Sequence, residues 1–133
     1  MNAAAIQFEP IDELTSPFGG PAQPERRVIR SESDWLALWN SLSVVLPPVD
    51  PPAIDFTQEM VIVTAMGQRS SGGHQISVEG VYEDSGELYV DVLEVSPTAA
   101  CIVTAVITTP IAAVRVERRD GDVNFMERAE SRC

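Results

Sequence analysis

The chain has 133 residues, a length that fits one domain, and 44% of them are hydrophobic, which is enough apolar material for a core. Its 9 basic residues, all arginine, against 20 acidic ones give a formal net charge of −11, which repels nucleic-acid phosphates and anionic lipids. The longest apolar run, residues 60–66, is far shorter than the roughly 20 residues that a membrane-spanning helix needs. We therefore expect no nucleic-acid partner and no transmembrane segment.

Residues 1–26 are predicted to form an extended arm and a loop. A short apolar stretch within residues 3–12 favours an edge strand, with Pro10 tolerated near its end. Three prolines and two glycines in residues 15–25 exclude regular structure there. The first ten residues lack a basic region followed by an apolar core, so they carry no visible export signal and leave the localisation unknown.

One amphipathic helix is predicted from Glu32 to about Val44. Its apolar side chains recur at helical spacing, and they are Trp35, Leu38, Trp39 and Leu42. Ser31 stands where a helix N-cap accepts from the backbone, and Asp34 completes a capping-box pattern with an acidic first turn. Four prolines between residues 47 and 52 predict an extended connector after the helix.

Strand signals dominate the rest of the chain. Residues 60–66 are apolar almost without alternation, which is typical of a central strand covered on both faces. Residues 74–83 and 87–95 alternate and flank Asp84-Ser85-Gly86, which predicts a hairpin. Residues 101–109 predict a further strand because they are rich in β-branched residues, and residues 112–119 predict a last one. A turn at Asp120-Gly121-Asp122 then leads into a short strand at residues 123–126 and a frayed tail at 127–133.

These elements predict an α+β, mainly β fold in a single domain, residues 1–133. We expect antiparallel, sandwich-like sheets of about six to eight short strands, with the helix near the N-terminal side packed against them. The two cysteines, Cys101 and Cys133, lie in no metal-binding spacing. They could pair, but the last residue of a chain is usually mobile, so the sequence favours one semi-buried thiol and one loose thiol.

Catalytic residues are few. His74 is the single histidine, and nucleophilic catalysis would have to combine it with Ser70, Ser71 or Cys101. No Gly-x-Ser-x-Gly motif surrounds these serines. The acidic pairs, such as Asp120 and Asp122, are typical of turns, and the sequence predicts no metal site and no cofactor. We expect a protein that is not an enzyme.

The glycine loop after residue 66 is the predicted partner-binding site. Its residues are Arg69, Ser70, Ser71, Gly72, Gly73 and His74, and the loop at residues 96–100 is a candidate second contact. The two glycines would allow close backbone approach to a protein partner. The alternative is a plain strand connector that needs a positive φ.

Several motifs in their order resemble the C-terminal domain of the protease-complex subunit PrcB, found in many bacterial proteins. They are VIRSESDWLALW, DFTQEMVIVTAMGQRSSGGHQISV, SPTAACIVTAVITTP and AAVRVER, which together span about Val28 to Val116. The resemblance implies a non-catalytic accessory role, with a protease as partner, and an extracytoplasmic or cell-surface location. The chain departs from the family pattern at His74, where related sequences often have Tyr, and it shows no signal peptide or lipidation cysteine.

The glycine loop also resembles, over a short stretch, a loop of chagasin-like protease inhibitors. Four hypotheses about function follow. The first is a protein-binding or accessory domain, and the second is a protease inhibitor. The third is a small hydrolase that uses His74 and Cys101, and the fourth is a structural domain that stabilises a larger chain. The sequence predicts no oligomeric state.

Overall fold

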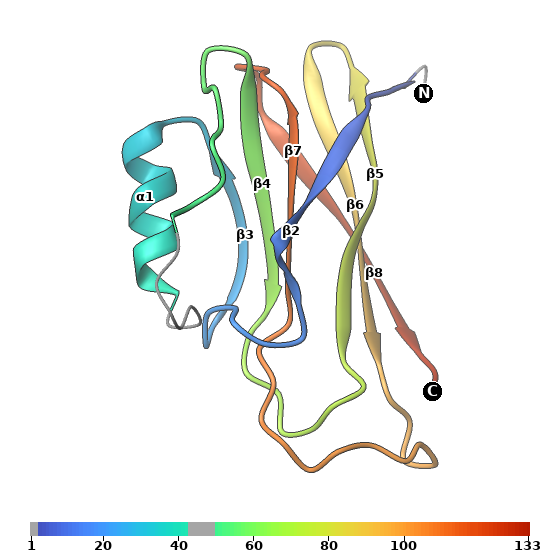
Figure 1. Cartoon of the computed structure of the whole chain (residues 1–133). Helices are drawn as coiled ribbons and strands as arrows, with labels where there is room; N and C mark the ends of the chain where they lie inside the picture. The colour runs from blue at the N-terminus through green and yellow to red at the C-terminus, as the bar shows by residue number, and fades with distance from the viewer. Residues whose placement is uncertain (1–2, 43–49) are drawn as a thin grey trace.

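The computed structural model describes residues 3–42 and 50–133, and it has two β-sheets with one helix on the outside of one sheet (Figure 1). The first sheet has the order β1-β5-β6-β8 and the second has the order β2-β7-β4-β3. The strands are β1 (Ala4–Ala5), β2 (Phe8–Ser16), β3 (Pro24–Ile29), β4 (Glu59–Met66), β5 (Gln75–Asp84), β6 (Glu87–Ser96), β7 (Ile111–Glu117) and β8 (Val123–Ser131), and the helix is α1 (Glu32–Ser41). The predicted α+β, mainly β fold is confirmed.

Strand β4 lies inside the second sheet and is buried on both faces, as its almost continuous apolar sequence predicts. Val61, Val63 and Ala65 face the helix and form one core layer with its side chains. Met60 and Ile62 face the first sheet and join a second core layer. Because successive side chains of a strand point to opposite faces, both faces need apolar residues, and the one buried polar side chain, Thr64, donates its hydroxyl to the Ala112 carbonyl.

The helix begins where the sequence predicts. The Ser31 side chain accepts a hydrogen bond from the backbone amide of Asp34 at 3.2 Å, which satisfies one of the free donors of the first turn. Trp35 and Trp39 are both buried against the second sheet, with ring centroids 6.0 Å apart. The helix ends at Ser41, and the predicted end at residue 44 and the first part of the proline connector lie outside the described residues.

Residues 3–26 are more regular than the arm and loop predicted over residues 1–26. The described chain starts in the first sheet, where Ala5 pairs with Tyr82, and then crosses to the second sheet, where Phe8 pairs with Val116. Strand β2 continues to Ser16 with a register shift, and β3 already begins at Pro24. The prolines are tolerated because both strands lie at sheet edges.

The predicted strand at residues 101–109 is wrong. In the structure this segment is a loop that carries the chain from β6 in the first sheet to β7 in the second, with one isolated bridge between Thr108 and Arg69. Several of its apolar side chains are exposed, among them Ile102 and Ile107. β-Propensity indicates a fit to a pleated, half-buried surface, and no such surface is available to this segment.

The predicted frayed tail at residues 127–133 is also wrong. Strand β8 continues to Ser131 and pairs with β6 along its whole length, from Leu88 with Val123 to Ser96 with Ser131. This pairing is parallel, whereas short turns between neighbouring strands favour antiparallel pairing throughout. Strand β8 is nevertheless exposed over most of its length, so its burial pattern resembles that of a tail.

Candidate functional site

Three segments without charged residues meet at one end of the molecule, which we call the neutral loop end. They are residues 15–24, 70–78 and 96–110, and none of them contains Asp, Glu, Lys or Arg. The Thr109 amide donates to the Pro17 carbonyl at 2.9 Å, which joins the first segment to the third. The Gly72 amide donates to the Thr104 carbonyl at 2.9 Å, which joins the second segment to the third.

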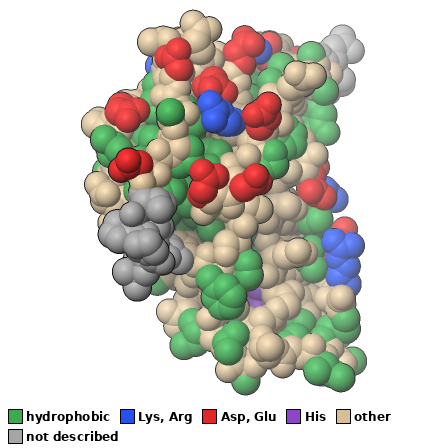
Figure 2. Space-filling view, in the orientation of Figure 1, with side chains coloured by type: hydrophobic (Ala, Val, Ile, Leu, Met, Phe, Trp, Pro, Cys, Tyr) green, Lys and Arg blue, Asp and Glu red, His purple; other side chains and the backbone are tan. Residues whose placement is uncertain are grey.

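The neutral loop end also collects exposed apolar side chains. Among the described residues, five of the seven large hydrophobic residues that are exposed belong to it, namely Phe18, Ile102, Val103, Val106 and Ile107. Ile102 has a relative exposure of 102% and Ile107 of 63%, so neither is covered by this chain. Figure 2 shows acidic side chains over the opposite half of this face, while the loop end is hydrophobic and uncharged.

Residues 69–74 lie within this end, as a contact loop would, but much of their backbone is already bonded to this chain. Arg69 exchanges two backbone hydrogen bonds with Thr108, at 2.8 and 2.9 Å. The Thr108 hydroxyl donates to the Ser71 carbonyl at 2.9 Å. The predicted loop therefore offers side chains to a partner, and its main chain supports the segment at residues 101–108.

The two glycines of the loop lie against that same segment. A Cβ on Gly72 would collide with the Thr104 hydroxyl. Gly73 has φ +90°, and a Cβ there would lie 3.0 Å from Val103 Cγ1. The close approach expected between the glycines and a partner is thus made within the chain, in agreement with the alternative of a connector that needs a positive φ.

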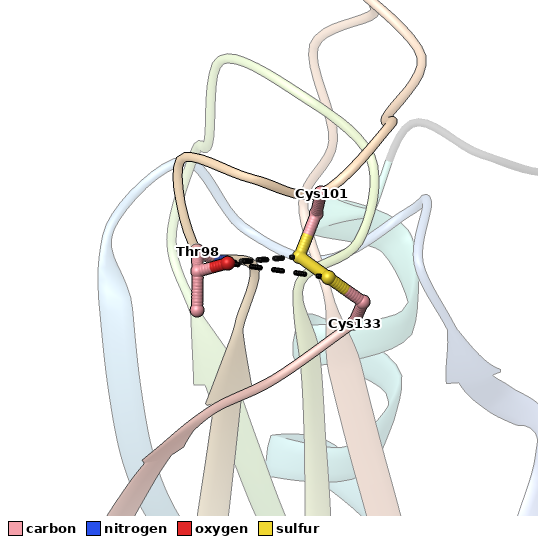
Figure 3. Close-up of a disulfide and its surroundings, with 3 residues drawn as sticks. All are labelled: Thr98, Cys101 and Cys133. Atoms are coloured by element: carbon pink, nitrogen blue, oxygen red, sulfur yellow. Dashed lines mark hydrogen bonds between the residues drawn. A yellow bond between two sulfur atoms is a disulfide. The ribbon is translucent and has the colours of Figure 1, made fainter.

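A disulfide between Cys101 and Cys133 fastens the neutral loop end, so the prediction of two free thiols is wrong. Figure 3 shows that it joins the loop after β6 to the chain beyond β8. Thr98 lies beside it, with its amide 3.2 Å from Cys101 Sγ. The last residue is within reach because the parallel pairing of β8 with β6 brings the chain back to Ser96, whose carbonyl accepts from the Arg132 amide at 3.0 Å.

His74 lies at the start of β5, partly buried, with Nδ1 3.2 Å from the Ser96 hydroxyl. Burial lowers the pKa of His74, and the nearby positive charge of Arg69 lowers it further. A surface hollow of about 440 Å³ lies beside it, lined by Thr15, Ser16, Pro17, Gly73, His74, Gln75, Ile76 and Cys133. These residues come from the end of β2, the start of β5 and the chain end.

The candidate catalytic residues do not come together as a nucleophile and base. Cys101 is held in the disulfide and has no thiol to ionise. Within the described part of the chain, His74 bonds to Ser96 and not to Ser70 or Ser71.

No group of three or more His, Cys, Asp or Glu side chains in residues 3–42 and 50–133 could hold a metal ion. The one helix in these ranges is too short to cross a bilayer.

Two acidic residues in turns, Asp55 and Asp120, stabilise local structure. Asp55 accepts hydrogen bonds from the amide and hydroxyl of Thr57, and these bonds lower the pKa of Asp55. Asp120 pairs with Arg118 at 3.0 Å in the turn before β8. Both arrangements are ordinary turn chemistry.

A second hollow of about 390 Å³ lies where the chain crosses between the sheets, near β1, β2 and the end of β7. Two arginines line it, but Arg115 pairs with Glu59 at 2.6 Å and Arg119 pairs with Glu83 at 2.7 Å. Since both cations are already neutralised, this hollow is a poorer candidate for an anionic ligand than its arginines suggest.

The candidate contact surface that the sequence does not predict is the exposed segment at residues 102–107. Its β-branched residues predict a strand, and the sequence predicts a frayed tail around its neighbour Cys133. One signal in the sequence does mark it: residues 96–110 contain no charged side chain in a chain that carries 20 acidic residues.

A family model described as PrcB C-terminal matches residues 60–117, from β4 through β7. The match contains residues 69–74 and the exposed segment at 102–107, and it leaves out the helix. No curated protein and no solved structure matched the chain. Over residues 60–117, a little less than half of its length, the chain resembles the PrcB C-terminal domain.

Proposed function

We propose that this protein is a non-enzymatic accessory domain that binds a protein partner through its neutral loop end, and that the partner belongs to a protease complex. The similarity to the PrcB C-terminal domain supports the accessory role, because the matched residues include most of the neutral loop end. The choice of a protease as partner rests on that similarity alone.

The observation that carries the proposal is the exposed apolar cluster on an otherwise acidic molecule. Large apolar patches on soluble domains mark contact surfaces, since leaving them in water is unfavourable. The cluster is also built on a fixed base: the disulfide holds one side of it and the Arg69–Thr108 bridge holds the other. A contact surface that is ordered before binding loses little conformational entropy on association.

The disulfide also bears on where the protein works. Structural disulfides persist in oxidising compartments and are rare in reducing ones. The Cys101–Cys133 bond therefore supports an extracytoplasmic location for this accessory role.

The test is a comparison of two charge substitutions in a pull-down from the source cells. Ile102→Asp places a carboxylate at the most exposed large apolar residue of the neutral loop end, while Leu36→Asp places one on the exposed side of the helix, where Leu36 is also solvent-exposed. We expect Ile102→Asp to lose the partner and Leu36→Asp to retain it. Equal capture by both variants would argue against the neutral loop end as the contact surface.

A protease inhibitor is the second candidate, and one observation favours it. Residues 102–107 form an exposed segment that is fixed at one end by the disulfide and at the other by the backbone bonds between Arg69 and Thr108. A segment fixed at both ends suits insertion into the substrate cleft of a protease. Titration into serine and cysteine proteases tests this function. A stoichiometric loss of protease activity would support inhibition, and unchanged rates at all ratios would leave the accessory role.

The proposal that the protein is not an enzyme has its own test. Hydrolase-directed activity probes should leave the protein unlabelled. Labelling of the wild type by such a probe that is lost in His74→Ala would contradict the proposal and support the hydrolase hypothesis.

A further inference from the structure

We propose that the uncovered edge of β5, at residues 75–80, is a second binding site that accepts an extended segment of a protein partner by β-strand addition. This inference goes beyond the proposed function. Residues 75–78 belong to the neutral loop end, but the site is the backbone edge of β5 and not the exposed apolar side chains of residues 102–107. It does not require the apolar cluster around Ile102 to be a contact.

Strand β5 is only partly covered on its outer side. Strand β1 pairs with it at Tyr82 and Glu83, and the Ile6 amide donates to the Val81 carbonyl at 2.8 Å. The chain then crosses to the second sheet, as Figure 1 shows. No strand in the described ranges lies beside residues 75–80 on that side, so their outward backbone groups are available to another chain.

The other sheet edges carry the features that normally prevent strand addition. Strand β8 has Glu127, Arg128 and Glu130, and β3 has three successive charged residues at 25–27. Strand β2 has Pro10 and a register shift. Charges, proline and irregular pairing all discourage edge-to-edge association. Residues 75–78, with the sequence QISV, have none of these features, which begin only at Glu79 and at the register shift between Val78 and Gly80.

The hollow beside His74 adds specificity to this edge. It opens between the end of β2 and the start of β5, and Gln75 and Ile76 belong both to its lining and to the uncovered edge. Strand-adding sites combine main-chain hydrogen bonds, which provide affinity, with a hollow for a side chain, which provides specificity. The lining is uncharged apart from His74 and suits a small or medium-sized uncharged side chain.

The net charge of the chain and the charge of Glu79 indicate which kind of segment binds at the β5 edge. A second copy of this chain would bring together two molecules of net charge −11, which disfavours self-association. Glu79, next along β5, is exposed and forms no salt bridge within the described residues. Its side chain accepts a hydrogen bond from Ser77, and its charge acts on Arg128, whose pKa is raised mainly by Asp91. The partner segment should therefore be uncharged where it passes residues 75–78 and carry a basic residue toward Glu79.

The test uses the acetylated and amidated peptide Thr-Val-Thr-Val-Thr-Arg at millimolar concentrations against the full chain, with amide NMR shifts as readout. We expect shifts and slowed hydrogen exchange at residues 75–80. N-methylation of alternate peptide amides should remove binding when the methylated amides face β5 and leave it unchanged for the other set, because alternate amides of a strand point to opposite sides.

Two lysine substitutions serve as a matched pair. Ser77→Lys adds a cation beside Glu79 and should weaken peptide binding by roughly fivefold, the effect of losing about one ion pair, because the lysine would pair with Glu79 and repel the arginine of the peptide. Ala129→Lys adds the same cation to the β8 edge and should have no effect on binding. If Ser77→Lys does not fold, Gln75→Lys replaces it, since Gln75 is exposed.

Three results would overturn the proposal. The first is the absence of shifts at residues 75–80 with the peptide, and the second is shifts confined to β8 or to residues 102–107. The third is a dimer, seen by sedimentation, that Ser77→Lys dissociates, because it would make a second copy the occupant. The variant Ile102→Asp should bind the peptide normally, so failure of this site and failure of the proposed function are distinguishable.

Discussion

The Gly72 amide donates a hydrogen bond to the Thr104 carbonyl at 2.9 Å, across 32 residues of sequence. This bond joins the glycine loop, which the sequence predicts as the partner-binding site, to the apolar segment at residues 102–107, which the sequence wrongly predicts as a strand. The two loops form one structure, so a change in either should alter both the stability and the shape of the neutral loop end.

Substitution of Gly73 is the first test of that coupling. Gly73→Ala should lower the free energy of unfolding by about 1–3 kcal/mol, because the residue has a positive φ and its new Cβ would press on Val103 and Pro97. Gly86→Ala is the matched control, since Gly86 has φ +82° but open space around it. Urea denaturation of both variants measures the difference. An equal loss in the two variants would show that crowding by Val103 and Pro97 contributes nothing.

Removal of the disulfide should destabilise the protein considerably. The bond closes a loop with a sequence separation of 32, for which the chain-entropy estimate is about 3–4 kcal/mol. The double variant Cys101→Ser, Cys133→Ser should therefore unfold at a lower temperature than the oxidised wild type. A reducing agent should lower the wild-type midpoint to that of the variant and leave the variant unchanged. A wild-type midpoint that does not respond to full reduction would contradict the role given to this bond.

Trp35 tests the contact between helix and sheet. The side chain is fully buried, and its Nε1 donates to the Pro52 carbonyl at 3.1 Å. Trp35→Ala should cost about 3–5 kcal/mol, and Trp35→Phe should cost less because it keeps most of the apolar volume. Leu36→Ala, on the exposed side of the same helix, should change stability by only about 0.5 kcal/mol. Equal effects at Trp35 and Leu36 would mean that the helix does not pack as described.

The stability of the protein should depend on the charge of His74 in mildly acidic solution. Burial, followed by the charge of Arg69, lowers the pKa of His74 in the folded state. Below about pH 6.5, the ordinary pKa, the unfolded chain binds a proton that the folded state resists. Stability is therefore complete above that pH and falls as the pH decreases. His74→Gln should flatten the curve between about pH 5 and 7, and an unchanged slope would place the effect elsewhere.

Local patterns predicted the parts of the fold that depend on near neighbours. The Ser31 cap, the buried Trp35 and Trp39, and the hairpin of β5 and β6 all follow from short-range spacing and turn chemistry. Strand β4 follows from composition alone, because a strand covered on both faces is apolar at nearly every position.

The missed features depend on contacts between distant segments. Strand β8 pairs in parallel with β6, and its charged sequence is that of a protected edge strand, which is hard to distinguish from a solvated tail. That pairing places Cys133 near Cys101, so the disulfide could not be predicted without it. The segment at 102–107 has strand-like residues but pairs with no strand, so tertiary structure overrides propensity.

The central claim is that the neutral loop end contacts a protein partner, and site-specific photocrosslinking tests it most directly. A photoreactive residue in place of Ile102 should form a discrete adduct with one protein in the source cells. The same residue in place of Leu36, which is exposed on the helix, should form none. An adduct from position 36 without one from position 102 would contradict the claim, as would the absence of any adduct from position 102.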